Sequence, residues 1–441
     1  MGVIINFLNI FRNRMKQKFF LLLLLFSLAK YIEAQTSGFN DSIAICFQEI
    51  RHNTIQYKDL WNLDLYGPVL LVDPATRKIY SNFPDSAGIL KQNGNIFTGL
   101  LPIMINIANT SLKWQGTSWA MIMLPLPQNN QERFDLLSHE LFHRSQPVLG
   151  FRLANSDNDH LDKREGRIYL RLELEALDLA LKTSDADEIR EHLANAFFFR
   201  KTRNSIFPGS AINENRLELN EGLATYTGIM MSGRNDQEKQ AYFEKKLIEF
   251  QKYPTFVRSF AYITTPLYGL ILSRLDKSWN KQVNDTTNLT DYFINAFRVS
   301  VPVILCPDCL ARYNYKVILD EETGREEEKA RQIAEFKKTF IEKPHLDIIL
   351  EKMNISFDPR NIIPLEEYGN VYPSMRITDN WGILTVTGGA LLSKNWDKVT
   401  VSEPVVMSSE KITGEGWTLE LKDSYIVEKN IPGGNSNVRK K

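Results

Sequence analysis

The segment Ser138-His139-Glu140-Leu141-Phe142-His143 limits the possible folds of this chain more than any other feature. Two histidines four positions apart lie one turn apart on the same face of a helix, so both imidazoles can reach one metal ion. The apolar spacing over 131–146 predicts that helix, and Pro147 ends it. The apolar stretch 118–124 directly before it is typical of a strand. A strand followed by a metal-binding helix predicts an α+β fold, in which a second element supplies a further ligand.

The chemistry expected of this segment is that of a zinc hydrolase. Zinc held by neutral nitrogen ligands lowers the pKa of its bound water and polarises a carbonyl group. Glu140 follows the first histidine and can lie beside that water as a general base. The alternative is an amphipathic helix with two packed histidines. The chain has only six histidines, and the strand–helix context favours a metal site, so we expect one Zn²⁺ per chain.

The residues offer several candidates for the third ligand. A metzincin would need Gly and His where this chain has Gln146 and Leu149, so that pattern is excluded. His160 lies in a polar loop without helical support, whereas Glu221 lies in a second predicted helix, with Glu218 one turn before it. A glutamate from a second helix would complete a tetrahedral site of two His, one Glu and a water.

The two segments His139-Glu140-x-x-His143 and Asn220-Glu221-Gly222-Leu223-Ala224-Thr225-Tyr226 together resemble the gluzincin zinc metallopeptidases, especially the aminopeptidase N-like branch. There an Asn-Glu-Gly-Phe-Ala type segment supplies the zinc-binding glutamate. The resemblance implies a zincin-like core with His139, His143 and Glu221 as metal ligands and Glu140 as the base. It also favours Glu221 over Glu218.

This sequence departs from the family pattern in three ways. The ligands His143 and Glu221 are separated by 77 residues, more than is usual in that branch. The Gly-x-Met-Glu-Asn segment that binds a free amine is not found, which leaves endo- versus exopeptidase activity open. Thr225 occupies the position of an Asp in thermolysin-like enzymes. We therefore expect a divergent gluzincin family.

The same resemblance implies a Tyr or His that donates a hydrogen bond to the oxyanion. Tyr262 and Tyr268 are the candidates, with Tyr262 slightly preferred as the second catalytic residue beside Glu140. Four other titratable residues in charged helical contexts are predicted to lie on the surface: Glu173, Glu175, His192 and His345.

The pattern along the chain predicts a small mixed sheet, then a mostly helical lobe, then β-structure. The strand at 118–124 is expected to be the edge strand along the cleft, where an extended peptide can pair with it. The predicted units are a signal peptide (1–34), a strand-rich N-terminal part of the catalytic unit (35–128), a helical zinc-binding lobe (129–355), a C-terminal β-region (356–432) and a disordered tail (433–441).

The N-terminus predicts export. Basic residues precede an 11-residue apolar run, residues 19–29, which is too short to span a bilayer but typical of a secretory signal peptide. No later segment is apolar enough for stable membrane insertion, so we expect a periplasmic or secreted protein. Removing residues 1–34 leaves 48 basic and 52 acidic residues, a net charge of −4 that argues against nucleic-acid binding. Cys306 and Cys309 predict a local disulfide, with Cys46 left over.

The leading hypothesis is therefore an exported zinc metallopeptidase, a hydrolase that acts on a peptide or protein substrate. The alternative from a different class is a non-catalytic, zinc-stabilised surface or periplasmic binding protein. A hydrolase of a non-peptide ester or amide would use the same zinc chemistry, so the sequence does not separate it from a peptidase.

Overall fold

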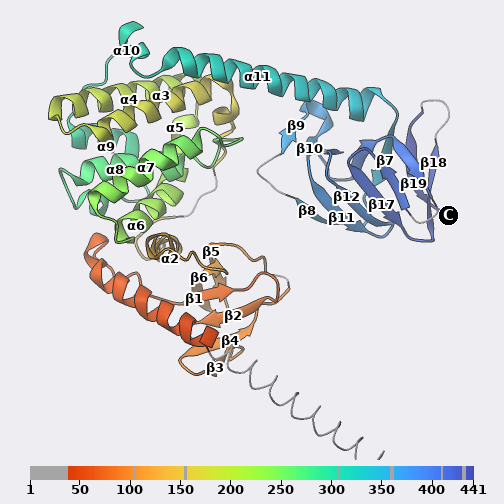
Figure 1. The fold of residues 1–441 in the computed structure, drawn as a ribbon, viewed down its shortest axis with the longest axis horizontal. Coiled ribbons are helices and arrows are strands. Elements are labelled where there is room, and N and C mark those ends of the chain that lie inside the picture. The colour runs from red at the N-terminus through yellow and green to blue at the C-terminus, as the bar shows by residue number, and fades with distance from the viewer. Residues whose placement is uncertain are drawn as a thin grey trace, which may run out of the picture.

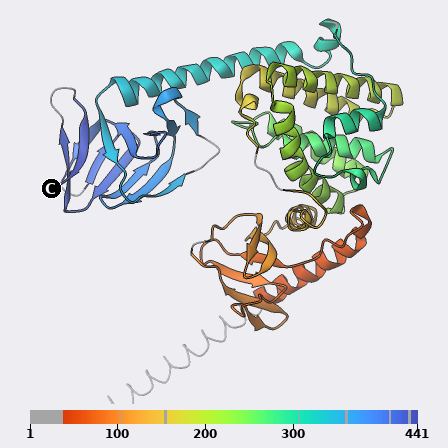
Figure 2. The ribbon, with the colours of Figure 1, turned by 180° about the vertical axis from the view of Figure 1, so that it is seen from behind.

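The computed structural model describes residues 38–103, 105–152, 156–305, 307–357, 362–408, 411–429 and 434–441. The predicted signal peptide lies outside these residues. The fold is α+β and follows the chain in three parts (Figure 1). A helix and a mixed sheet come first, a helical lobe follows, and a long helix then leads to a C-terminal β-domain, an arrangement that the opposite view also shows (Figure 2).

The N-terminal part contains a six-stranded sheet in the order β3-β4-β2-β1-β6-β5. Only the β1–β6 pair is parallel within this sheet. The strands are β1 (Val69–Val72), β2 (Lys78–Ser81), β3 (Lys91–Asn93), β4 (Ile96–Leu100), β5 (Thr110–Trp114) and β6 (Thr117–Met123).

A helix over residues 38–56 precedes this sheet and was not expected in a strand-rich unit. Its residues Ile43, Phe47 and Ile50 recur at helical spacing and are buried in the same core as Leu71 and Ile122. Alternate residues of β1 and β6 point to the other face of the sheet, where a second, smaller core forms. β1 and β6 are therefore buried on both faces, which explains their nearly continuous apolar sequences.

The predicted position of the edge strand is wrong. β6 lies between β1 and β5, and β5 forms the edge of the sheet. The hairpin between Trp114 and Thr117 adds this outer strand, whose half-buried residues give a weaker apolar pattern than β6. Both strands contact α2 (Asn130–Ser145), the helix that carries the two histidines.

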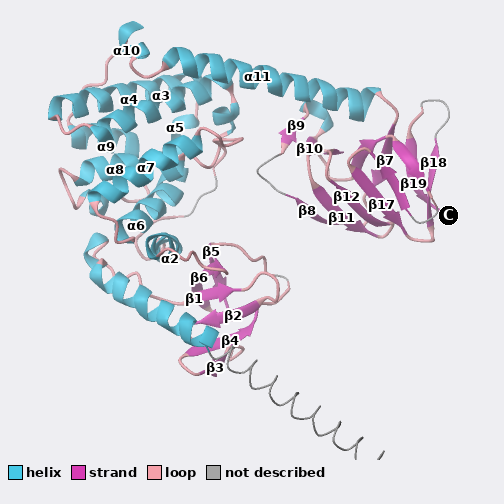
Figure 3. Ribbon diagram, in the orientation of Figure 1, coloured by secondary structure: helices cyan, strands magenta, loops and turns pink. Residues whose placement is uncertain are grey.

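The helical lobe follows the sheet and consists of helices joined by loops (Figure 3). The helix expected over 131–146 is present as α2, and the helices that follow it make this part of the chain mostly helical, as expected. After α2 its elements are η2 (Asp159–Asp162), α3 (Arg164–Lys182), α4 (Ala186–Ile206), α5 (Ser210–Leu217), η3 (Glu218–Gly222), α6 (Leu223–Met231), α7 (Asp236–Phe250), α8 (Ala261–Ser273), η4 (Trp279–Gln282), α9 (Leu289–Phe297) and α10 (Pro307–Ala311). The short η1 (Lys58–Leu60) precedes the sheet.

Helix α11 (Tyr315–Lys337) connects the lobe to the β-domain, as both views show. Glu322 anchors its first half, because this buried carboxylate accepts hydrogen bonds from Arg167 and Arg171 of α3 at 2.6 and 2.8 Å. Its charged second half ends in the π-helical turn η5 (Lys338–Glu342).

The β-domain begins at β7, before the predicted boundary at residue 356, and consists of two sheets. Their buried faces share one core that includes Ile348, Trp381 and Leu384. The first sheet contains β18 (Tyr425–Lys429), β19 (Ser436–Lys440), β7 (His345–Ile349), β14 (Lys398–Ser402), β13 (Ala390–Leu392), β10 (Asn370–Tyr372) and β9 (Ile363–Pro364). The second contains β15 (Pro404–Met407), β16 (Lys411–Gly414), β17 (Trp417–Leu421), β12 (Gly382–Val386), β11 (Met375–Asp379) and β8 (Asn354–Phe357), and η7 (Glu366–Tyr368) lies between β9 and β10.

The prediction of a disordered tail over 433–441 is wrong for the described residues, 434–441. Strand β19 pairs antiparallel with β18 and parallel with β7. Val438 packs against the core of the β-domain, so the tail fills the edge of β7 that would otherwise stay unpaired.

Two further sequence features can be placed. Cys46 is free and buried, and Cys309 is disulfide-bonded; the other half of the predicted pair, Cys306, is outside the described residues. Among the helices that the structure describes, none is long and apolar enough to cross a membrane.

Candidate metal centre

Helix α2 presents both histidines toward α6. Its first turn is capped by Asn129, whose side chain accepts a hydrogen bond from the Glu132 amide. A Cβ at Gly228 of α6 would lie 2.6 Å from the Asp135 carbonyl oxygen of α2. Glycine at this position therefore allows the two helices to pack closely enough for their side chains to share one site.

Glu221 lies in the π-helical turn η3, between α5 and α6. Such turns contain an extra residue and alter the direction of side chains, and they are frequent at functional sites. A Cβ at the neighbouring Gly222 would lie 2.5 Å from Thr265 Oγ1 of α8. The Gly of the Asn-Glu-Gly segment thus has a packing role, since it lets α8 contact the turn.

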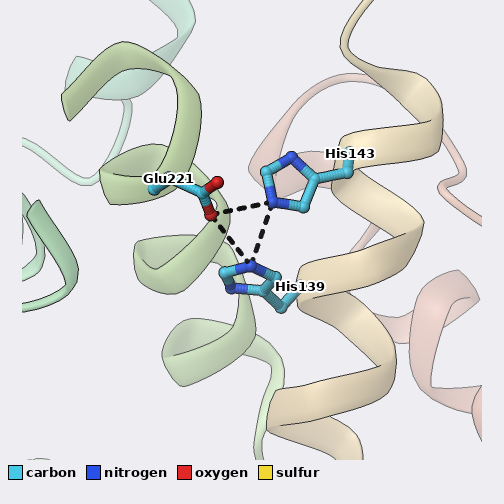
Figure 4. A group of neighbouring side chains, drawn as sticks. All are labelled: His139, His143 and Glu221. Atoms are coloured by element: carbon cyan, nitrogen blue, oxygen red, sulfur yellow. Dashed lines mark hydrogen bonds and ion pairs between the residues drawn. The ribbon is translucent and has the colours of Figure 1, made fainter. Parts of the chain in front are cut away.

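The predicted ligands His139, His143 and Glu221 point toward one another from α2 and η3 (Figure 4). The two Nε2 atoms of the histidines are 3.0 Å apart. Glu221 Oε2 lies 3.2 Å from His143 Nε2 and 3.6 Å from His139 Nε2. The side chains are 14%, 10% and 12% exposed in the same order, so the cluster is largely buried but not sealed from solvent.

These distances match a tetrahedral metal site. Zinc binds imidazole nitrogen and carboxylate oxygen at about 2.0–2.2 Å, which places neighbouring ligand atoms of a tetrahedron about 3.3 Å apart. The observed separations of 3.0, 3.2 and 3.6 Å lie on both sides of that value. The three described ligands would leave one position of the tetrahedron open.

Gln146 fixes the orientation of the His143 ring. Its Oε1 lies 2.8 Å from His143 Nδ1, and its Nε2 donates a hydrogen bond of 3.0 Å to the Asn220 carbonyl oxygen. With the Nδ1 proton donated to Gln146, the lone pair of His143 Nε2 faces the other two ligand atoms. Gln146 therefore links the histidine helix to the turn that carries Glu221. Sequence reasoning missed this role, because Gln146 was noted only as a departure from the metzincin pattern.

Thr225 contacts the other histidine. Its Oγ1 lies 3.5 Å from His139 Nδ1 and donates a hydrogen bond of 2.9 Å to the Glu221 carbonyl oxygen. A neutral hydroxyl thus stands where the resemblance to thermolysin-like enzymes would place an Asp. Its 3.5 Å contact with His139 is at the limit of hydrogen-bond distance.

Tyr262 lies at the centre, and Tyr268 does not. The Tyr262 hydroxyl donates a hydrogen bond of 2.7 Å to Glu221 Oε2, and its ring stacks parallel to His139 with the centroids 5.9 Å apart. Burial and the nearby Glu221 carboxylate raise the pKa of Tyr262 far above its ordinary value, so it remains a donor. Tyr268 is buried in the helical core, where it donates to Glu173.

Glu140 is a buried carboxyl group without a hydrogen-bond partner for its Oε2 in the described structure. The residue is only 4% exposed. Burial raises the pKa of Glu140 to about 7, while the nearby His143 acts in the opposite direction. Glu221 behaves differently: burial opposes its ionisation, but hydrogen bonds to His139 and His143 outweigh burial and hold its pKa well below the usual range.

The rival ligands are paired elsewhere. His160 Nε2 lies 2.7 Å from Glu214 Oε1. Glu218 accepts two hydrogen bonds from the Arg200 guanidinium, at 2.7 and 3.0 Å. Neither residue reaches the metal centre.

A group of buried charged residues lies behind η3, and we call it the buried ion network: Glu173, Arg200, Arg203, Glu214 and Glu218. The prediction that Glu173 lies on the surface is wrong, because Arg200 and Arg203 of α4 bond its two carboxylate oxygens at 2.8 Å each. The surface prediction is also wrong for His192 and His345, which are buried. His192 is hydrogen-bonded to the Tyr313 hydroxyl, and His345 donates to the Lys343 carbonyl oxygen. Glu175 is half-buried and accepts a hydrogen bond from Asn314.

Comparison with known proteins adds no relative: no protein-family model, no curated protein and no solved structure matches the chain. Its chemistry must therefore be argued from the geometry of the centre.

Proposed function

We propose that this chain is an exported zinc metallopeptidase of the gluzincin type, with a zincin-like core. The observation that carries the proposal is the triangle of His139 Nε2, His143 Nε2 and Glu221 Oε2, with separations of 3.0–3.6 Å. Three lone-pair atoms at such distances repel one another unless a proton or a cation lies between them. Two imidazoles and one carboxylate suit zinc, and three protein ligands with one open position are typical of catalytic rather than structural zinc.

When bound, zinc would lower the pKa of water and polarise the carbonyl group of the substrate. Glu140 would accept a proton from the attacking water and pass it to the leaving amine. Its buried oxygen without a partner supports this role, since a carboxylate kept only for packing is expected to be hydrogen-bonded. Tyr262 would turn its hydroxyl from Glu221 toward the oxyanion, which would then be its nearest acceptor.

The arrangement of the N-terminal part fits a peptide substrate. β5 is the edge strand of the mixed sheet that contacts α2; the other edge strand is β3. An extended peptide could add to this edge through main-chain hydrogen bonds, which would place its carbonyl groups along the histidine helix.

The alternative, a non-catalytic zinc-stabilised binding protein, is less well supported. Structural zinc sites usually have four protein ligands, and the described residues supply three. Such a protein also has no use for a buried, unpartnered carboxylate next to its ligands.

Elemental analysis of purified protein tests the proposal first. Wild-type protein should contain one zinc per chain, Glu221→Ala should lose it, and Glu175→Ala should keep it as a matched control on α3. Glu140→Gln should bind zinc but no longer cleave a peptide library that the wild type cleaves. Wild-type protein without zinc, or an active Glu140→Gln variant, would refute the proposed mechanism.

A further inference from the structure

Arg258, in the loop between α7 and α8, lies beside the metal centre with most of its side chain in solvent. Arg258 Nη2 lies 3.6 Å from Glu221 Oε1, and the arginine side chain is 67% exposed. Within the described part of the chain, its side chain makes this one ion pair and no hydrogen bond. Most of its five N–H donors therefore face solvent beside the centre.

Holding Glu221 in place does not require this arginine. Glu221 Oε2 faces the two histidines and accepts the hydrogen bond from Tyr262. The contact of Arg258 with Oε1 is too long for a hydrogen bond, and an exposed pair of this kind contributes little to stability. The position of Arg258 is better explained by a ligand that approaches from solvent.

We propose that Arg258 binds a carboxylate of the substrate, so that the preferred substrates carry a negative charge next to the bond that is cleaved. This inference rests on the proposed function. The planar guanidinium can bind a carboxylate through two parallel hydrogen bonds. Consecutive Cα atoms are about 3.8 Å apart, so an arginine in contact with a metal ligand reaches only residues close to the cleaved bond. That carboxylate is either an acidic side chain or the free C-terminus of a peptide.

Binding of two small hydroxamates to zinc-loaded protein tests the inference without turnover. Acetohydroxamate is neutral apart from its metal-binding group, whereas the monohydroxamate of succinic acid carries an additional carboxylate. By titration calorimetry the wild type should prefer the second probe by about tenfold, the contribution of one partly exposed charge-assisted contact. Arg258→Met should abolish this preference, and Arg258→Lys should keep part of it. Lys252→Met removes one positive charge from the same loop and should leave the preference unchanged.

The outcomes separate the two proposals. Equal binding of both probes to the wild type would overturn the role of Arg258 and leave the zinc centre standing. Binding of neither probe would overturn the zinc centre and this inference together. Peptide libraries with free and amidated C-termini then identify the source of the carboxylate: cleavage beside acidic residues in both libraries indicates a side chain, and cleavage only with free C-termini indicates the terminal carboxylate. Cleavage that is indifferent to both would overturn the inference.

Discussion

Replacing Arg200 with methionine tests whether the buried ion network stabilises the turn that carries Glu221. The Arg200 guanidinium bonds Glu218 of η3 at 2.7 and 3.0 Å and Glu173 of α3 at 2.8 Å. All three side chains are at most 2% exposed. Burial disfavours the charge of Arg200, but Glu173 and Glu218 outweigh it and raise its pKa above the ordinary value.

The methionine fills much of the same volume but, among the described residues, leaves the buried Glu218 with a hydrogen bond from Thr264 alone. Breaking a buried ion pair on one side costs about 3–5 kcal/mol, because the remaining charge is neither solvated nor neutralised. We expect a loss of that size in the free energy of unfolding of the zinc-free protein, measured by urea denaturation and far-UV circular dichroism. The double variant Arg200→Met, Glu218→Met should recover part of the loss, because it removes the unpaired carboxylate.

Arg190→Met is the matched control for this experiment. Arg190 lies on the same helix and pairs with Asp187, but these side chains are 52% and 89% exposed. Its replacement should cost less than about 1 kcal/mol. If Arg200→Met costs no more than Arg190→Met, the buried ion network does not stabilise the lobe as argued. A stable Arg200→Met protein with unchanged zinc affinity would show that Glu221 is positioned without it.

Three further predictions concern the centre and its surroundings. Gln146→Ala should weaken zinc binding by about tenfold or more in a chelator competition, because His143 loses its orienting partner, whereas Gln131→Ala on the same helix should not. Tyr262→Phe should keep its zinc by elemental analysis and lower peptide turnover about 10²–10³-fold, and unchanged turnover would exclude the tyrosine from the reaction. Burial opposes the charge of Glu214, but Arg203 outweighs it and holds the pKa of Glu214 well below its usual value. Its stabilising contribution is therefore complete above the unfolded pKa and lost on acidification, so Glu214→Gln should lose less stability than wild type between about pH 5 and pH 3 in urea unfolding.

Local patterns in the sequence were sufficient to predict the helix that carries the two histidines. The helical spacing over 131–146 places His139 and His143 on one face, and the structure has that helix as α2. The burial of Glu173 and the position of the edge strand depend on tertiary packing, which local patterns do not reveal. Glu173 lies in a helix with many charged residues, and only the approach of α4 with its two arginines makes that position a buried one. Likewise, β6 is not the edge strand because β5 pairs with its outer side in a hairpin, and the local pattern of β6 does not indicate this.

The different environments of Glu218 and Glu221 show the limit of helical periodicity most clearly. In an α-helix each residue turns by about 100°, so side chains three apart lie on nearly the same face, and both glutamates are then plausible ligands. The π-helical turn over Glu218–Gly222 rotates less per residue and increases the angle between them. Glu218 can therefore point back to Arg200 while Glu221 points to His143. One turn thus joins the buried ion network to the metal centre. A substitution at Arg200 should therefore disturb the position of Glu221, although the two residues are not in contact.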